Sequence, residues 1–149
     1  MPSIRRTRDI SKLDELRRIR LFDNLPRREL DIIAANLDEV SVPEGETLVR
    51  EGHHNDAFWI ILEGEAAYKI ENGPSRQLGP GDFFGATSML DGKPAVGTIK
   101  TLTPMRALVA SAAQFRALEG NDTIALRLMA AALERMREDL EAHFRASTA

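Results

Sequence analysis

The sequence predicts an α+β fold: an antiparallel β-roll or jelly roll (a double-stranded β-helix) flanked by two short N-terminal helices and a long C-terminal helix. Apolar residues recur at helical spacing in 9–37 and again in 111–145, whereas 38–110 contains short apolar or alternating stretches separated by Gly, Pro and Asn turns. Closely spaced strands of this kind are typical of sandwiches, jelly rolls and barrels. We expect a single domain over 9–145, with flexible tails at 1–8 and 146–149.

Composition bounds the class of protein. The chain has 149 residues, 43% of them hydrophobic and 29% charged, which is typical of a soluble globular domain. The formal net charge of −3 does not favour nucleic acid, and the absence of cysteine excludes disulfides and thiolate chemistry. No apolar run approaches the ~20 residues of a membrane span, and no apolar segment of a secretory signal follows the basic N-terminus. We therefore expect a cytoplasmic location.

Two short helices are expected before residue 38. Ser11–Asp14 has the pattern of a capping box, and an amphipathic helix should follow it. Pro26 is well suited to the first position of the second helix. The apolar residues at helical spacing are Leu13, Leu16 and Ile19 in the first helix, and Leu30, Ile33, Ala34 and Leu37 in the second.

The strands of the roll are expected between successive turns. Breaks are provided by Pro43–Gly45, Gly52, Asn72–Pro74, Gly79–Gly81 and Pro104. The predicted strands are Val40–Val42, Thr47–Val49, Phe58–Leu62, Ala66–Ile70, Thr98–Leu102 and Met105–Ala110.

The C-terminal part returns to a helical period. A capping box at Ser111–Gln114 begins one helix, and either Asn121 or Asp122 caps a second helix of about 33 Å at 1.5 Å per residue. This helix has an apolar seam with the 3, 4, 3, 4 spacing of a coiled coil, formed by Leu126, Met129, Leu133, Met136 and Leu140. The seam could pack on its own domain or on a second copy. We favour a homodimer, because the helix is longer than one small domain can cover.

The sequence offers no catalytic or metal-ligand set. His53 and His54 are adjacent and His143 is distant in sequence, which is poor chelating geometry and speaks against a cupin-type enzyme on a similar roll. No serine lies in a Gly-x-Ser-x-Gly context, and no P-loop or dinucleotide fingerprint is present. We therefore expect a non-enzyme without a metal.

The segment Gly85–Thr98 is the strongest candidate for a binding loop. Small residues allow backbone amides to form an anion-binding concavity, and Lys93 or Lys100 could supply charge. Side-chain hydroxyls are available from Thr87, Ser88 and Thr98. A tight connection without a ligand fits these residues equally well. The nearby aromatic residues Trp59, Phe83 and Phe84 could line a pocket, but aromatic residues in a β-run are more often core.

These features together resemble the cyclic-nucleotide-binding domain, the sensor module of catabolite-activator and Fnr-type regulators, kinase regulatory subunits and some channels. The resemblance spans Leu21 to Leu140 and includes the long final helix. It rests on Leu21–Leu25, Glu44–Glu46, Arg50–Gly52, Asp56–Ile61, Gly64 and Gly79–Gly85. It implies that a β-roll holds cAMP or cGMP, that flanking helices move on binding, and that the long helix dimerises and helps to close the pocket.

The resemblance also implies the ligand-binding residues. They are Phe84, Gly85, Ala86, Thr87, Ser88, Lys93, Ala95 and Thr98. Ala86 stands where the family has the glutamate that holds the ribose, and Ala95 stands where it has the arginine that pairs with the phosphate. Losing two charge-assisted hydrogen bonds of about 1.5–3 kcal/mol each should weaken cyclic-nucleotide binding by roughly two to four powers of ten. Lys93 is a candidate substitute for the arginine, as a point charge.

Two functions follow as expectations. The first is a stand-alone regulatory module that senses a small anionic ligand such as cAMP or cGMP and signals through its helices to a separate effector protein. The alternative is a ligand-free dimeric adaptor or complex subunit that keeps the roll. No DNA-binding element is expected after the long helix, nor an attached membrane or catalytic part.

Overall fold

The computed structural model describes residues 5–7 and 12–147. The helices are α1 (Lys12–Arg18), η1 (Arg20–Phe22, a 3-10 turn), α2 (Arg27–Ala35), α3 (Ala86–Asp91), α4 (Ala112–Glu119) and α5 (Asp122–Ser147). The strands are β1 (Arg5–Thr7), β2 (Asp38–Val42), β3 (Thr47–Val49), β4 (Ala57–Glu63), β5 (Ala66–Lys69), β6 (Ser75–Leu78), β7 (Phe83–Phe84), β8 (Thr98–Thr101) and β9 (Met105–Ser111). This order confirms the predicted α+β class.

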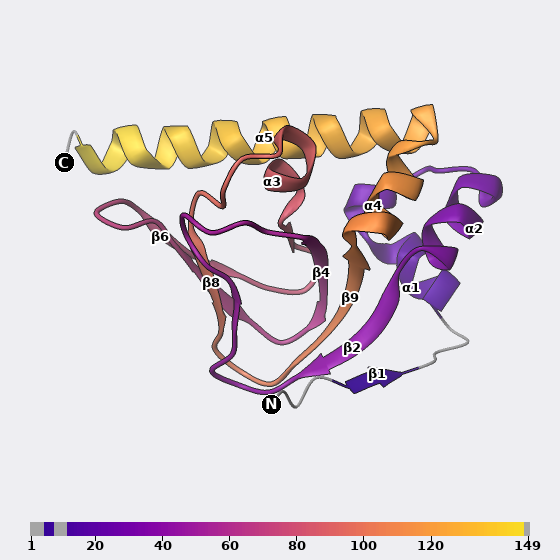
Figure 1. Ribbon diagram of the computed structural model, residues 1–149, viewed down its shortest axis with the longest axis horizontal. Coiled ribbons are helices and arrows are strands. Elements are labelled where there is room, and N and C mark those ends of the chain that lie inside the picture. Colours follow the sequence, from indigo (N-terminus) through magenta and orange to yellow (C-terminus); the bar gives the residue numbers. More distant parts are fainter. Residues whose placement is uncertain (1–4, 8–11, 148–149) are drawn as a thin grey trace.

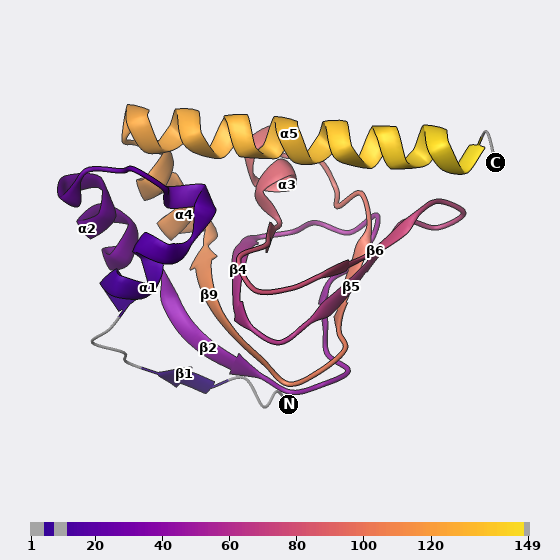
Figure 2. The same cartoon turned by 180° about the vertical axis from the view of Figure 1, so that it is seen from behind.

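Two antiparallel sheets form the β-roll. One sheet has the strand order β1-β2-β9-β4-β7, and the other has the order β3-β8-β5-β6. Figure 1 shows the roll with α1, α2 and α4 gathered at one end, while α5 runs along one side and passes over α3. The reverse view in Figure 2 shows that α5 continues past the helical end toward the β5–β6 hairpin. One long helix therefore contacts both the helical end and the opening of the roll.

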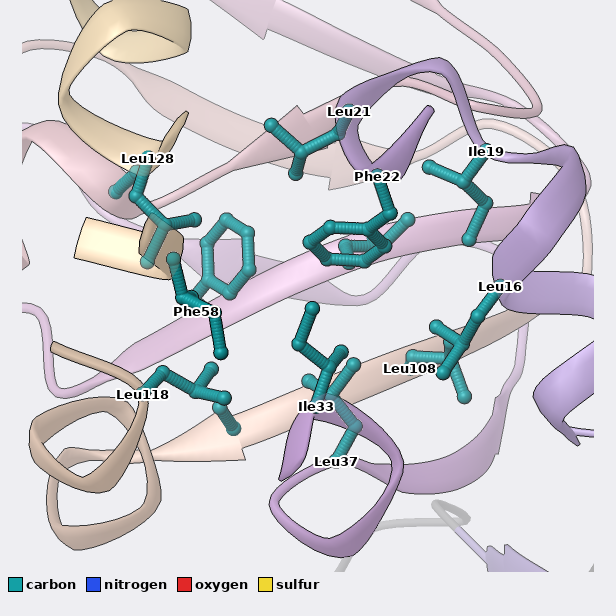
Figure 3. Packing of buried hydrophobic residues seen from close by; sticks show 14 of the residues in the cluster. Leu16, Ile19, Leu21, Phe22, Ile33, Leu37, Phe58, Leu108, Leu118 and Leu128 are labelled. Atoms are coloured by element: carbon teal, nitrogen blue, oxygen red, sulfur yellow. The ribbon is translucent and has the colours of Figure 1, made fainter. Parts of the chain in front are cut away.

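Strand β4 separates two hydrophobic clusters. Its side chains alternate between the two faces of the sheet, as in any strand, but here both faces are buried. Phe58 and Ile60 pack with the helices, in the cluster drawn in Figure 3. Trp59 and Ile61 point into the roll and pack with Val49 and other residues of the second cluster. Two buried faces explain why β4 is a continuous apolar run and not an alternating one.

The helices dock on the first cluster through their apolar faces. Figure 3 shows side chains of this cluster, and the labelled ones are Leu16, Ile19, Leu21, Phe22, Ile33, Leu37, Phe58, Leu108, Leu118 and Leu128. They come from α1, η1, α2, α4, α5, the strands β4 and β9, and the residues beside the helices. All ten are at most 7% exposed. This packing fixes the N-terminal part of α5, and hence the direction in which the rest of α5 extends over the roll.

The helix caps follow the predicted chemistry at the C-terminal end. The Ser111 hydroxyl accepts from the Gln114 backbone N–H at 3.2 Å, and the Gln114 side chain accepts from the Ser111 N–H at 2.8 Å, which confirms the capping box. The Asn121 side chain accepts from the Ile124 N–H at 3.0 Å, so Asn121 is the cap of α5. Pro26 is the N-cap of α2 and not its first helical residue, and Ser11 lies outside the described residues.

Four local expectations need correction. Residues 5–7 were expected in a flexible tail but form β1, because β2 offers them an antiparallel edge. Residues 146–147 continue the backbone of α5 and are not tail. No strand was expected at 75–78, between two predicted turns, but this segment forms β6 and pairs with β5. The segment expected as an open loop after Gly85 begins with the helix Ala86–Asp91, which ends at Gly92 with a φ of 71°.

Among the described residues, no helix combines the length and apolarity needed to cross a membrane.

Candidate ligand-binding site

A cavity of about 380 Å³ lies between the interior of the roll and α5. Val49, Phe84, Ala95 and Ile99 contribute buried apolar wall from the second cluster. The cassette segment 83–88 forms one side, the turn 70–74 forms another, and Met136, Leu140 and three polar residues of α5 cover it. The volume falls in the range of small-molecule sites, which is about 300–1,000 Å³.

Gly85 places the start of α3 against the cavity wall. Its φ is 92°, a left-handed conformation that suits glycine, and a Cβ there would lie 2.3 Å from the Ala57 carbonyl oxygen. The buried Asn55 amide donates to both the Ala57 and Gly85 carbonyl oxygens, at 2.9 and 3.1 Å. This contact fixes the turn between β7 and α3, so Ala86 lies buried on the wall with an exposed fraction of 2%.

Ala95 is held on the wall by the neighbouring backbone. Its N–H donates to the His53 carbonyl oxygen at 3.0 Å, and its carbonyl oxygen accepts from the Gly52 N–H at 2.8 Å. Nearby, Gly97 leaves room for the ring of Tyr68, because a Cβ at Gly97 would lie 2.3 Å from that ring. Two short residues therefore define the wall at the position where the resemblance implies a phosphate.

A polar cluster lies at the α5 side of the cavity. Arg135 donates to the Phe83 carbonyl oxygen at 2.9 Å, and its guanidinium carbon lies 4.7 Å from the centre of the Phe83 ring. Asp139 accepts from Arg76 at 2.6 Å. Burial, followed by the charge of Asp139, raises the pKa of Tyr68 to about 12, and burial lowers the pKa of Arg135. These contacts fasten α5 to the roll with groups that also line the cavity.

Six of the eight predicted ligand-binding residues lie on the cavity wall. They are Phe84, Gly85, Ala86, Thr87, Ser88 and Ala95. Lys93 is exposed and is not among the lining residues, so it does not replace the missing arginine in this structure. Thr98 is not among them either, and its hydroxyl accepts from the Glu51 N–H at 3.0 Å.

Other lining residues were not singled out from the sequence. Tyr68, Arg135 and Asp139 reach the cavity only because the hairpin β5–β6 and the far half of α5 meet there. Of the three aromatic residues weighed above, Phe83 and Phe84 line the cavity. Trp59 is not among the lining residues and stacks on Phe84 at a centroid distance of 5.9 Å. In the sequence, Arg135 is recognisable only as a cation next to the seam residue Met136. Surface arginines on amphipathic helices have the same position, so the pattern does not identify a binding residue.

The seam of α5 is largely exposed to solvent. Its residues are exposed by 68% at Leu126, 49% at Met129, 62% at Leu133, 51% at Met136 and 56% at Leu140. The domain instead receives Ile124, Ala125, Leu128 and Ala132. The interpretation in which the seam is buried against its own domain is therefore wrong. Met136 and Leu140 lie at once in the seam and at the edge of the cavity.

Within the described residues, no group of three or more His, Asp or Glu side chains could hold a metal ion.

The family model for the cyclic nucleotide-binding domain matches residues 39–122, more than half of the chain. The chain belongs to the cyclic nucleotide-binding domain family. The matched region contains all but the first residue of β2, the strands β3 to β9, every residue of the second hydrophobic cluster, and the cassette from Phe84 to Thr98. Within that cassette this cyclic nucleotide-binding domain has Ala86 and Ala95, both buried.

Curated and solved relatives agree with this assignment. The cAMP-dependent protein kinase regulatory subunit of Aspergillus fumigatus is 36% identical over 93 residues, which is 61% of this chain and 22% of that protein. The regulatory domain of Toxoplasma gondii PKA with cAMP matches at a TM-score of 0.64 and 25% identity, over 74% of this chain and 46% of that one. A cyclic nucleotide-binding domain from Methylobacillus flagellatus shares the fold at a TM-score of 0.74 and 23% identity, over 93% of this chain and 86% of that one. The chain thus spans less than a quarter of the curated relative.

Proposed function

We propose that this domain is a regulatory module that binds a small molecule between the roll and α5 and transmits its occupancy through α5 to a partner protein. One observation carries the proposal: α5 supplies part of the cavity wall and, on the same turns, part of an exposed apolar seam. A ligand that contacts Met136 or Leu140 therefore acts on the surface that a partner would contact. The similarity to kinase regulatory subunits supports a non-catalytic role.

We further propose that the seam of α5 joins two copies of the chain. An exposed row of large apolar side chains at coiled-coil spacing is costly in water and is relieved by pairing with a second row. The effector that receives the signal is then a separate protein. The cytoplasmic location remains a prediction.

The cyclic nucleotides cAMP and cGMP are the first ligands to test. Of the eight residues implied by the resemblance, six line the cavity. The glutamate and arginine expected at 86 and 95 are alanines, so we expect dissociation constants roughly two to four powers of ten above those of a site with both anchors. Isothermal titration calorimetry with each nucleotide, up to millimolar concentration, measures this.

The alternative is a ligand-free dimeric adaptor. The two buried alanines favour it, because a cavity without the two charged anchor residues has lost the side chains that would hold a cyclic nucleotide. Mass spectrometry of the purified, undenatured protein separates the two functions: a co-purifying small molecule supports the sensor, whereas an empty cavity together with a tightly bound partner protein supports the adaptor.

A further inference from the structure

We infer that the cavity takes an uncharged, largely apolar small molecule, and not a cyclic phosphate. The inference rests on the proposal that this cavity is the sensor site, and it names the chemical class of the ligand. It follows from the partners of the charged wall residues, from the buried wall near Ala86 and Ala95, and from the neutral hydroxyls that remain.

Of the Arg, Asp and Glu residues of the wall, Arg135 and Asp139 already have partners, and the exposed Glu71 carries a negative charge that would repel a phosphate. Arg135 is the only arginine or lysine among the described residues that line the cavity. Its guanidinium donates to the Phe83 carbonyl oxygen, covers the Phe83 ring, and lies 3.7 Å from the carboxylate of Asp82. Asp139 is paired with Arg76. Turning Arg135 toward a phosphate would break the contacts that fasten α5 to the roll.

The wall that would meet the phosphate is apolar. Ala86 and Ala95 are 2% and 6% exposed, and Val49, Phe84 and Ile99 continue the same surface. An anion placed against such a wall loses hydration and gains no cationic side chain, so only neutral donors such as backbone N–H groups would offset a cost of several kcal/mol. An apolar body placed there gains about 25 cal/mol for each Å² of apolar surface removed from water. The wall therefore favours an apolar ligand over a phosphate.

The other polar side chains of the wall are three hydroxyls and the exposed residues Glu71, Asn72 and His143. Tyr68, Thr87 and Ser88 bring hydroxyls to the cavity. The Tyr68 hydroxyl, like any tyrosine hydroxyl, is protonated at neutral pH, and it can donate to a carbonyl or ether oxygen. An otherwise apolar molecule with one or two carbonyl or ether oxygens matches these hydroxyls, whereas a charged molecule does not.

The test uses N-phenylnaphthylamine, a neutral apolar dye whose fluorescence increases on leaving water, titrated against the full chain. We expect micromolar binding. A wall variant, Val96→Glu with Leu140→Glu, places two carboxylates at the edge of the cavity on side chains that are both 56% exposed, so folding should be preserved. We expect it to bind the dye at least tenfold more weakly.

The matched control is Leu102→Glu with Leu126→Glu, at positions 45% and 68% exposed and absent from the wall. It removes as much surface hydrophobicity, including one seam residue, and should bind the dye like the natural chain. Equal loss in both variants would mean that the dye binds the surface, and would overturn the inference. Binding of cAMP or cGMP at micromolar concentration without dye binding would overturn the ligand class but keep the sensor. Binding of neither would overturn both.

Discussion

Restoring the two anchors, Ala86→Glu with Ala95→Arg, should convert the cavity into a cAMP site. Both alanines line the cavity, and their backbones are fixed by Gly85 and by the paired segment at Gly52 and His53. The new side chains therefore start from the wall of a cavity of about 380 Å³. Each charge-assisted hydrogen bond is worth about 1.5–3 kcal/mol, so the pair should tighten cAMP binding by roughly two to four powers of ten.

Calorimetry of the natural chain, both single variants and the double variant measures this gain directly. Thermal unfolding provides a second measurement. With free cAMP at 100 times the dissociation constant, binding adds about 2.7 kcal/mol to the free energy of unfolding. For a chain of 149 residues this corresponds to a rise in Tm of about 5 to 10 °C.

The matched control is Ala86→Gln with Ala95→Met, which adds similar volume without charge. It should fold equally well and gain little affinity for cAMP. If the charged double variant unfolds cooperatively, has a native circular dichroism spectrum, and binds cAMP no better than the natural chain, then the idea that the cavity keeps the shape of a nucleotide site is refuted.

Three further predictions concern stability, assembly and pH. Gly85→Ala should lower the free energy of unfolding by at least about 2 kcal/mol more than Gly81→Ala in urea denaturation, because both glycines have a φ near 90° but only at Gly85 would a Cβ meet backbone, at 2.3 Å. Equal losses would remove the steric argument. Leu133→Glu should convert a dimer into a monomer in light scattering, whereas Leu102→Glu should leave the mass unchanged, and a natural chain that is already monomeric contradicts the seam dimer. Tyr68, the single tyrosine, should titrate in its absorbance near pH 12 when folded and near pH 10 in denaturant. Because its folded pKa is raised, its contribution to stability is present below pH 10 and is lost between pH 10 and 12. A folded midpoint near 10 would contradict the burial of the Tyr68 hydroxyl.

Much of the fold could be predicted because local patterns and tertiary contacts agree. Ser111 caps a helix in the sequence and in the structure, since a capping box needs only four consecutive residues. The strand near Phe58 was predicted from a continuous apolar run, and the structure explains that run by two clusters on opposite faces of β4. The strand β6 was missed, because its alternation over Ser75–Leu78 is too short to signal without its partner β5.

The sequence by itself determined the chemistry of the cassette: the glycine at 85, the hydroxyls at 87 and 88, and the alanines at 86 and 95. Tertiary structure decided which of these meet a ligand. In the folded chain Lys93 is exposed, and the Thr98 hydroxyl accepts from a loop N–H. Arg135 lies on the cavity wall and donates to the Phe83 carbonyl oxygen. Tertiary structure also left the α5 seam largely exposed, because Ile124 and Leu128 on the opposite face pack into the core. Such outcomes depend on which segments far apart in the chain come together, and that information is not contained in any local pattern of residues.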